Sequence, residues 1–518
     1  MQPKTRLYRF FEILPGTLMW LTFILPVALA FTYPRVVSLA IMIYALLWFF
    51  KTVVMSRHLI LGYYGYRDAM KKNWYHEMVS SHPKEWERVT HVAFVPMYKE
   101  SFEIVAATFD ALIASDYPLK KVIPILCTEG RAGEEAQEVA KKIKKKYAHY
   151  FPHFFVTVHP ADIPGEVKGK GPNMNWAAKE VIPQLLSSGY KAKDILVTTL
   201  DADNRVDRHY FACVTKAFLE SPDPAHTSYQ PLPMYFNNIW DVPLFVRMIA
   251  LGSSFWVMVQ ATRADRLRNF SAHSQSLEGL IEADYWSSTS IVEDGHQYWR
   301  SLYAFNGNHT VVPIFVPIYQ DAVLGATLKD TIKEQYLQKR RWAWGVSDVA
   351  YVFTNNLKDS NMSFWEKWKQ FFILLEGHYS WATTSLVLAL GGWPPLLINA
   401  EYQNTVFAYN FPFFYSKILL AAGIGMIITL VISTLVLPPP PRRYKNHKLI
   451  VIRDWILTPI ILPITNIFLG ALPAIDSQTR LMFGRYLEFR VTVKRMVDTV
   501  VTPETKKTPA PKSAKEIV

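Results

Sequence analysis

The hydrophobic positions of this chain form two kinds of run, short and long. Four short apolar or β-branched runs lie between residues 91 and 200, and stretches with helical periodicity separate them. Short β-branched runs that alternate with helices predict βαβ units and a parallel sheet. The four runs are 91–95, 122–126, 154–158 and 195–200, and the clearest intervening helix is 134–147.

The long apolar blocks lie toward the two ends of the chain. Blocks 14–31 and 36–55 are each about long enough to span a bilayer, and a short segment with a proline separates them. Basic residues before the first block place the N-terminus in the cytoplasm, so the pair predicts a helical hairpin. A cleaved signal peptide is the alternative for the first block, but no small-residue cleavage site precedes the second.

A second apolar region follows residue 378. Blocks 379–397 and 415–437 are spanning candidates, and four prolines followed by basic residues mark a cytoplasmic end. Block 456–472 contains two prolines and an asparagine and has a basic downstream flank. We therefore expect a re-entrant or interfacial segment there rather than a full span.

Three further stretches combine apolar and charged residues. Segment 236–261 is apolar but contains an aspartate, a proline and an arginine, which predicts a pair of amphipathic helices against protein or the bilayer surface. Segments 335–346 and 365–372 mix aromatic residues with Lys and Arg, a composition typical of the membrane interface.

Composition agrees with a membrane protein. Half of the 518 residues are hydrophobic, the net charge is +13, and the basic residues cluster beside the long blocks. That placement favours a cytoplasmic face against anionic lipid over nucleic-acid binding. Cys127 and Cys213 lie in apolar or mixed runs, so we expect free buried thiols in a reducing compartment.

Two carboxylates follow the last short run. Asp201 and Asp203 are one residue apart after a predicted buried strand, and Asn204 follows them. Open α/β sheets bind ligands beyond the carboxyl ends of their strands, and Mg²⁺ takes one or two carboxylates plus substrate phosphates. The alternative is a strand-end turn closed by an Asx side chain.

Two loops carry residues suited to a nucleotide. Tyr98 and Glu100 directly follow the first strand, where an aromatic ring and an acid can stack on and hydrogen-bond a base; an N-capping loop is the alternative. Lys170 lies in a glycine-containing loop before a helix predicted at 174–182, which suits a diphosphate; a flexible loop is the alternative.

Two later motifs have a catalytic composition. Glu293 and Asp294 offer a carboxylate that can take a proton from an acceptor hydroxyl, although a solvent-facing acidic pair is the alternative. On a helix, Gln338, Arg341 and Trp342 lie within a turn of one another, so Arg can hold phosphate and Trp can stack on a sugar. A basic, aromatic interfacial helix would have the same composition.

In this order, these motifs resemble those of family 2 processive glycosyltransferases of the GT-A fold, such as cellulose, chitin and hyaluronan synthases. Val292-Glu-Asp resembles their T-E-D element, and Gln338-Lys-Arg-Arg-Trp342 fits Q-x-x-R-W. Phe489-Arg-Val-Thr-Val-Lys494 fits the F-x-V-T-x-K gating loop of bacterial cellulose synthases. The resemblance covers about residues 14 to 494.

The resemblance implies a role for each matched residue. It makes Asp294 the general base, with Glu293 beside it, and gives Asp201 and Asp203 the nucleotide and its Mg²⁺ or Mn²⁺. The other residues it implies in substrate binding are Tyr98, Glu100, Glu129 and Lys170 for the base and diphosphate; Gln338, Arg341 and Trp342 for the diphosphate and acceptor sugar; and Phe489, Val491, Thr492 and Lys494 for closure over the donor.

The chain departs from the family pattern at two motifs. Thr128-Glu129-Gly130 stands where the family has D-D-G, so Glu129 takes the place of the base-binding aspartate, and Val292 replaces the threonine of T-E-D. His273 falls where the family has an acceptor-terminus loop. We expect it to be a structural or sugar-contacting histidine rather than a metal ligand.

These observations predict a cytosolic α/β GT-A (Rossmann-like) domain inserted between transmembrane helices, with interfacial amphipathic helices. The predicted parts are a transmembrane hairpin (1–60), the glycosyltransferase domain (85–346), a transmembrane and re-entrant region (360–475), a gating-loop-like segment (476–500) and a disordered tail (501–518).

The predicted function is inverting, metal-dependent sugar transfer from a nucleotide sugar, such as a UDP-sugar, to a growing polysaccharide. We expect export of the chain through the protein's own helices and residence in the plasma or inner membrane. One alternative is a non-processive enzyme with a lipid-linked acceptor. Another is a transporter with a degenerate soluble domain, which the scarcity of charges inside the predicted spans disfavours.

Overall fold

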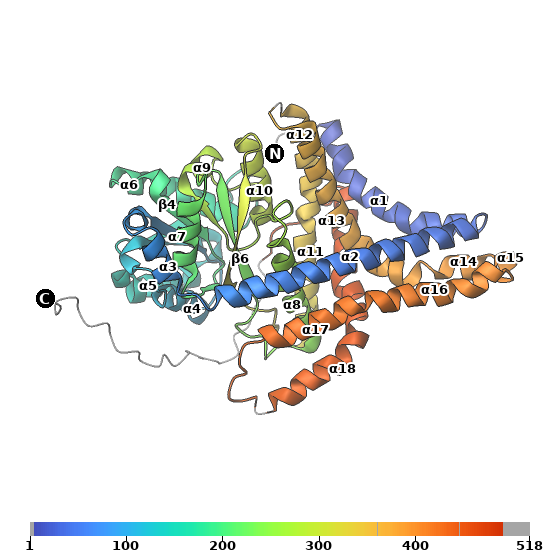
Figure 1. Ribbon diagram of the computed structural model, residues 1–518. Helices are drawn as coiled ribbons and strands as arrows, with labels where there is room; N and C mark the ends of the chain where they lie inside the picture. Colours follow the sequence, from blue (N-terminus) through green and yellow to red (C-terminus); the bar gives the residue numbers. More distant parts are fainter. Residues whose placement is uncertain (1–4, 360, 445, 491–518) are drawn as a thin grey trace.

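A mixed sheet forms the centre of the α/β domain in the computed structural model, which describes residues 5–359, 361–444 and 446–490 (Figure 1). The strands are β1 (Thr90–Pro96), β2 (Val122–Glu129), β3 (Phe155–His159), β4 (Ile195–Thr199), β5 (Arg205–Val206), β6 (Thr227–Met234), β7 (Ser274–Ser276) and β8 (Thr310–Tyr319). Their order across the sheet is β3-β2-β1-β4-β7-β6-β8-β5.

The prediction of a parallel sheet holds for one half of it. The four predicted strands are confirmed as β1 to β4, and all are parallel to their neighbours within that half. In the other half, β7 is antiparallel to both β4 and β6, and β5 is antiparallel to β8. Sequence pattern missed these strands because β7 is Ser-Gln-Ser, whereas β6 and β8 each contain two prolines, which argue against a strand.

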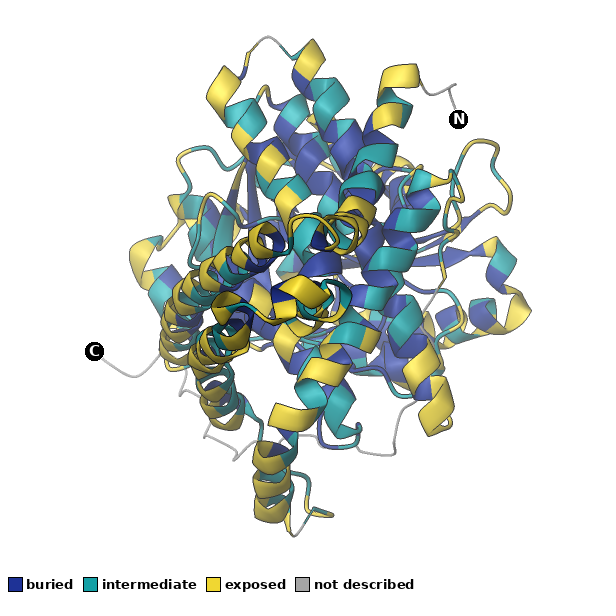
Figure 2. Ribbon diagram, turned by 90° about the vertical axis from the view of Figure 1, so that its right-hand side faces the viewer, coloured by how far each residue is buried: buried dark blue, intermediate teal, exposed yellow. Residues whose placement is uncertain are grey.

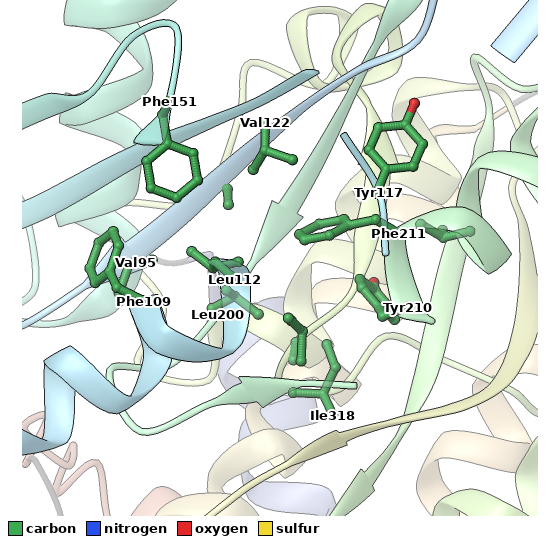
Figure 3. Packing of buried hydrophobic residues seen from close by; sticks show 14 of the residues in the cluster. Val95, Phe109, Leu112, Tyr117, Val122, Phe151, Leu200, Tyr210, Phe211 and Ile318 are labelled. Carbon is green, nitrogen blue, oxygen red and sulfur yellow. The ribbon is translucent and has the colours of Figure 1, made fainter. Parts of the chain in front are cut away.

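The two faces of the sheet carry separate apolar layers. Along β1, Ala93 and Val95 belong to the layer that includes residues of α4, α5 and α7, whereas Val92 and Phe94 face α6, as expected for the two-residue period of a strand. Figure 3 shows part of the first layer, where Phe109 and Leu112 of α4 lie close to Val95. These helices are α4 (Phe102–Ile113), α5 (Glu134–Tyr147), α6 (Lys170–Ser187) and α7 (Tyr210–Glu220).

Within the described residues, five helical stretches are long and apolar enough to cross a membrane, which indicates a membrane protein. They project from one side of the α/β domain (Figure 1), and many of their large apolar side chains are exposed (Figure 2). The stretches are Arg6–Ala30 (α1), Pro34–Ala69 (α2), Phe364–Ile398 (α13, Phe364–Leu390, and α14, Trp393–Ile398), Val406–Val436 (α16, Val406–Ala422, and α17, Ile424–Val436) and His447–Met482.

Several of these helices are longer than the apolar blocks predicted. The second helix continues past residue 55 to Ala69, and the stretch 365–372 is the first part of α13 rather than a separate helix. Block 456–472 lies inside α18 (His447–Asn466), a π-helical turn (Ile467–Ala471) and α19 (Leu472–Met482), which follow one another without a break. Hydropathy marks only the apolar part of a helix, so polar extensions at its ends escape it.

The predicted helix pair at 236–261 is wrong. One helix, α8 (Leu244–Gln260), follows an irregular segment that contains Asp241 and Pro243. Proline has no backbone N–H to donate within a helix. Pro243 accordingly lies directly before the first residue of α8. The remaining α-helices are α3 (Trp74–Ser81), α9 (Leu277–Glu282), α10 (Glu293–Ala304), α11 (Leu328–Ala343), α12 (Asp348–Lys358) and α15 (Ala400–Gln403).

Helix α2 joins the apolar helices to the sheet. A Cβ atom on Gly62 would lie 2.5 Å from Met258 of α8, and one on Gly65 would lie 2.8 Å from the ring of Phe315 in β8. Only glycine allows such a close approach of the helix backbone. The α/β domain is therefore held directly against the end of a candidate span.

Candidate active site

The turn after β4 presents the two aspartates at the centre of the sheet. Asn204 closes this turn, because its Oδ1 accepts a hydrogen bond from the Asp201 backbone N–H at 2.9 Å and its own N–H donates to the Asp201 carbonyl at 3.0 Å. The Asx-type turn considered as an alternative is therefore present. It directs Asp201 to the Ser271 hydroxyl at 2.5 Å, and Asp203 to the backbone N–H of Asp321 at 3.0 Å.

Lys170 connects this turn to a third element. It is the first residue of α6, and its Nζ lies 2.9 Å from Asp201 Oδ1 and 3.1 Å from Asp294 Oδ1. Asp294 is the second residue of α10, so side chains from α6, the β4 turn and α10 meet at one point. Only 8% of Lys170 is exposed, and a charge buried to this degree requires such partners.

The electrostatics of this cluster follow from burial and from charge. Burial opposes the charged form of Lys170, but Asp201, Asp294 and Glu293 outweigh it and raise the lysine pKa. Burial raises the pKa of Glu293 to about 8, and the negative charge of Asp294 adds to this shift. The positive charges of Lys170 and Arg341 lower the pKa but do not cancel the shift. Glu293 is thus a buried acid that holds its proton near neutral pH.

The Gln338 motif lies on α11, close to this cluster. Arg341 is near enough to act on the pKa of Glu293, and its guanidinium carbon lies 5.1 Å from the centre of the Phe489 ring. The Trp342 ring lies 6.4 Å from that of Tyr235. Burial, Asp201 and Asp203 all raise the pKa of Tyr235, so this tyrosine lies between the aspartate turn and Trp342. Gln338 is buried and accepts a bond from Gln335 at 3.3 Å.

Phe489 covers the loop before α6. A Cβ atom on Gly169 would lie 2.9 Å from Phe489 Cγ, so the phenylalanine lies directly on the glycine backbone. The ring therefore lies between Gly169 and Arg341, which are far apart in sequence. Val491, Thr492 and Lys494, the other predicted gating residues, lie outside the described residues.

A second group of residues lies at the ends of β1 and β2. The Glu100 carboxylate accepts a bond from the Tyr98 backbone N–H at 2.6 Å. Arg131 joins this loop to Glu129, because its guanidinium carbon lies 4.4 Å over the Tyr98 ring and its Nε donates to the Glu129 carboxylate. Burial raises the pKa of Glu129, although Arg131 opposes this shift. Asn173 holds α6 beside this group by donating to the Cys127 carbonyl at 2.9 Å.

His273, expected to be structural or sugar-contacting, is buried. Its Nδ1 lies 3.0 Å from the Phe270 carbonyl oxygen, and burial lowers its pKa although Asp294 opposes this. Four residues in this region escaped sequence reasoning: Arg131, Tyr235, Ser271 and Asp321. Arg131 is two residues after Glu129, so the sequence could have indicated it as the partner of that glutamate. The other three residues have no local pattern that marks them.

The metal expectation has a suitable but small donor set. No three His, Cys, Asp or Glu side chains in the described part of the chain gather as a ready-made metal site. Asp201 and Asp203 offer carboxylate oxygens from one turn, which fits Mg²⁺ or Mn²⁺ when a substrate diphosphate supplies further oxygens. Asp201 contacts Lys170 and Ser271, whereas Asp203 is buried and accepts a hydrogen bond from the Asp321 backbone N–H.

Comparison of the sequence with models of protein families, and with curated proteins, finds no match. One solved structure that resembles this chain is a mannosyltransferase, PcManGT from Pyrobaculum calidifontis, in complex with GDP-Man and Mn²⁺. The two have a TM-score of 0.39 and 13% sequence identity, and the match covers 81% of this chain and 99% of the mannosyltransferase chain. Another is S. aureus TarS, residues 1–349, in complex with UDP-GlcNAc. It has a TM-score of 0.35 and 11% sequence identity, and the match covers 67% of this chain and 91% of the TarS chain. These scores are low, so a function for this chain has to rest on its own residues.

Proposed function

We propose that this protein is a membrane-bound family 2 glycosyltransferase that transfers a sugar from a nucleotide sugar to an acceptor hydroxyl with inversion. The observation that carries the proposal is the contact of Lys170 with both Asp201 and Asp294. One cation then links the turn expected to hold the nucleotide to the carboxylate expected to act on the acceptor. A surface acidic pair at 293–294 would not be buried around a lysine.

The proposed donor site is the space around Lys170, Asp203 and Arg341. Lys170 exchanges a carboxylate for a diphosphate oxygen when the donor binds, and Arg341 adds a second cation. When bound at Asp203, Mg²⁺ or Mn²⁺ would offset negative charge on the leaving nucleoside diphosphate. In this proposal Tyr98 and Glu129, at the ends of the neighbouring strands, bind the base.

Asp294 is the proposed general base. It removes the proton from the acceptor hydroxyl, whose oxygen forms a bond to the anomeric carbon while the bond to the diphosphate oxygen breaks. Glu293, with its raised pKa, stays neutral, and Asp294, which contacts Lys170, takes the proton. Trp342 offers a ring on which the acceptor sugar stacks.

The position of Trp342 supports a polymer that leaves through the apolar helices. The next residue, Ala343, packs with Met19 of α1 and Ala382 of α13. A chain that grows at Trp342 is thus already at the edge of the helix bundle. A second candidate, transfer to a lipid-linked acceptor, is favoured by an apolar groove of about 630 Å³ between α1 and α13.

Purified protein incubated with a panel of nucleotide sugars, with released nucleoside diphosphate as the readout, tests the proposal. We expect Asp294→Asn to lower transfer at least about 100-fold, because the base is lost, while nucleoside diphosphate binding remains. Asp284→Asn is the matched control, since Asp284 is exposed and pairs only with Lys179 among the ion pairs of the described residues.

Normal turnover by Asp294→Asn would rule out its role as base. Absence of donor consumption by the wild-type protein would favour the transporter alternative. A long polymer supports the processive reading, and short, detergent-soluble products support the lipid-linked acceptor.

A further inference from the structure

The segment that follows α19 reaches across the candidate donor site. Phe489 rests on Gly169 beside Arg341, and Arg490 pairs with Glu334 of α11 at 2.5 Å. Because Phe489 lies near the end of the segment 483–490, its position depends on how the start of that segment is held. Its base lies against the first turns of α1, more than 450 residues earlier in the sequence.

Arg9 of α1 fixes the end of α19. Its guanidinium donates to the carbonyl oxygens of Leu481 at 2.7 Å and Met482 at 2.5 Å. The last carbonyls of a helix have no partner within the helix, and a cation there also interacts favourably with the helix dipole. The chain then turns at Gly484, whose φ of 69° suits glycine, directly beside Arg9.

Glu12 fixes the segment itself. Its carboxylate is 1% exposed and accepts hydrogen bonds from Arg9 at 3.0 Å and from the Tyr486 hydroxyl at 2.8 Å. The Tyr486 ring lies edge-on to Trp344, 6.2 Å away, at the end of the helix that carries Arg341 and Trp342. A buried carboxylate is costly without donors, so it holds the segment in one position.

We propose that Arg9 and Glu12 are positioning residues for donor binding: through Tyr486 they set the segment 483–490 so that Phe489 lies over Gly169 and Arg341. The first helix of the chain thereby controls closure of a site built from residues 98 to 342. This role rests on the proposed glycosyltransferase function, but the contacts that define it do not.

Tyr486→Phe in the full-length, detergent-solubilised protein tests the proposal, because it removes the hydroxyl and keeps the ring on Trp344. The first measurement is the rate of trypsin cleavage after Arg485 and Arg490, both exposed, without nucleotide and with UDP or GDP plus Mn²⁺. We expect cleavage to become about tenfold faster, the equivalent of one hydrogen bond to a charged group. Glu12→Gln should act in the same direction.

The second measurement is steady-state kinetics with the donor that the wild-type protein consumes. We expect KM for the donor to rise about tenfold, with kcat and the melting temperature little changed. The control is Tyr33→Phe, an exposed tyrosine between α1 and α2, far from the Arg9 end of α1. Arg9→Lys keeps the charge but loses the forked donor, so it should fall between Tyr486→Phe and wild type.

Unchanged cleavage and unchanged KM in Tyr486→Phe would overturn the proposal. A lowered melting temperature with unchanged KM would also overturn it, because that result describes a purely structural contact. If no nucleotide sugar is consumed by the wild-type protein, the glycosyltransferase proposal fails, and the cleavage rates alone decide whether α1 holds the segment.

Discussion

At the scale of single residues, the candidate site is a balance between buried charges. Lys170 pairs with both Asp201 and Asp294, whereas Glu293 is as deeply buried and has a raised pKa. Gly171 allows this packing, since a Cβ there would lie 3.0 Å from that of Glu293 and 2.5 Å from the Ser287 carbonyl oxygen. The burial that brings these groups together therefore also makes the stability of the protein depend on pH.

Glu293 should make the protein less stable as pH rises. Its pKa is raised in the folded state, so its contribution to stability is complete below the ordinary glutamate value of about 4.5 and is lost as pH rises through about 8. We expect the stability of Glu293→Gln relative to wild type to rise by up to about 3 kcal/mol between pH 5.5 and 8. Thermal unfolding in detergent measures this difference. The exposed Glu278→Gln should run parallel to wild type; parallel curves for Glu293→Gln would refute the assignment.

At the scale of elements, close glycine contacts join the apolar helices to the α/β domain. Gly62 of α2 lies on Met258 of α8, Gly16 of α1 lies on Met482 of α19, and Gly425 of α17 lies on Thr52 of α2. Small residues allow helix backbones to approach closely, which is how helices associate in membranes. The positions of α8 and α19 therefore follow from the helices they touch.

Gly62→Ala should weaken the contact between α2 and α8. A Cβ at this position would lie 2.5 Å from the Met258 carbonyl oxygen, a clash that the backbone must relieve at about 1–3 kcal/mol. The matched control is Gly252→Ala on α8, where the new Cβ meets no atom of the described residues within 4 Å. That variant should be neutral or stabilising because alanine favours helix. Thermal unfolding of the two variants, measured side by side, tests this expectation. Equal melting temperatures would contradict it.

At the scale of the whole molecule, two ion pairs join the stretch His447–Met482 to helices α8 and α11, one near each end of the stretch. Asp454 pairs with the buried Arg247 of α8, and Asp476 pairs with Arg340 of α11 at 2.9 Å. At the other end of the bundle, Asn399 donates to the Phe31 carbonyl at 2.9 Å. The stretch His447–Met482 is also one of the five that are long and apolar enough to cross a membrane. The re-entrant or interfacial segment expected from the sequence stays a prediction.

Cysteine labelling in cells with a membrane-impermeant maleimide tests that topology. We expect Thr32→Cys and Asn404→Cys to react in intact cells, and Lys191→Cys and Arg485→Cys to react only after permeabilisation; all four positions are exposed. The native Cys127 and Cys213 are buried, so background labelling is low. Labelling of Arg485→Cys in intact cells would show that His447–Met482 crosses the membrane.

The sequence by itself determined the first four strands, the apolar helices and the chemical types at the site. Those features depend on local pattern: period-two burial in β1, long apolar runs, and carboxylates directly after β4. It also placed Lys170, Asp201 and Asp294 in motifs that the structure brings into contact.

Only the tertiary structure decided the mixed half of the sheet, the partner of Asp203, and the contact of α1 with the segment 483–490 that carries Phe489. Strands such as Ser274–Ser276 have no apolar pattern of their own, and the partners of Asp321 and Glu12 are more than 100 residues away in the sequence. Such contacts arise because packing brings distant backbone together and buried charges must then find partners, which no window of local sequence contains.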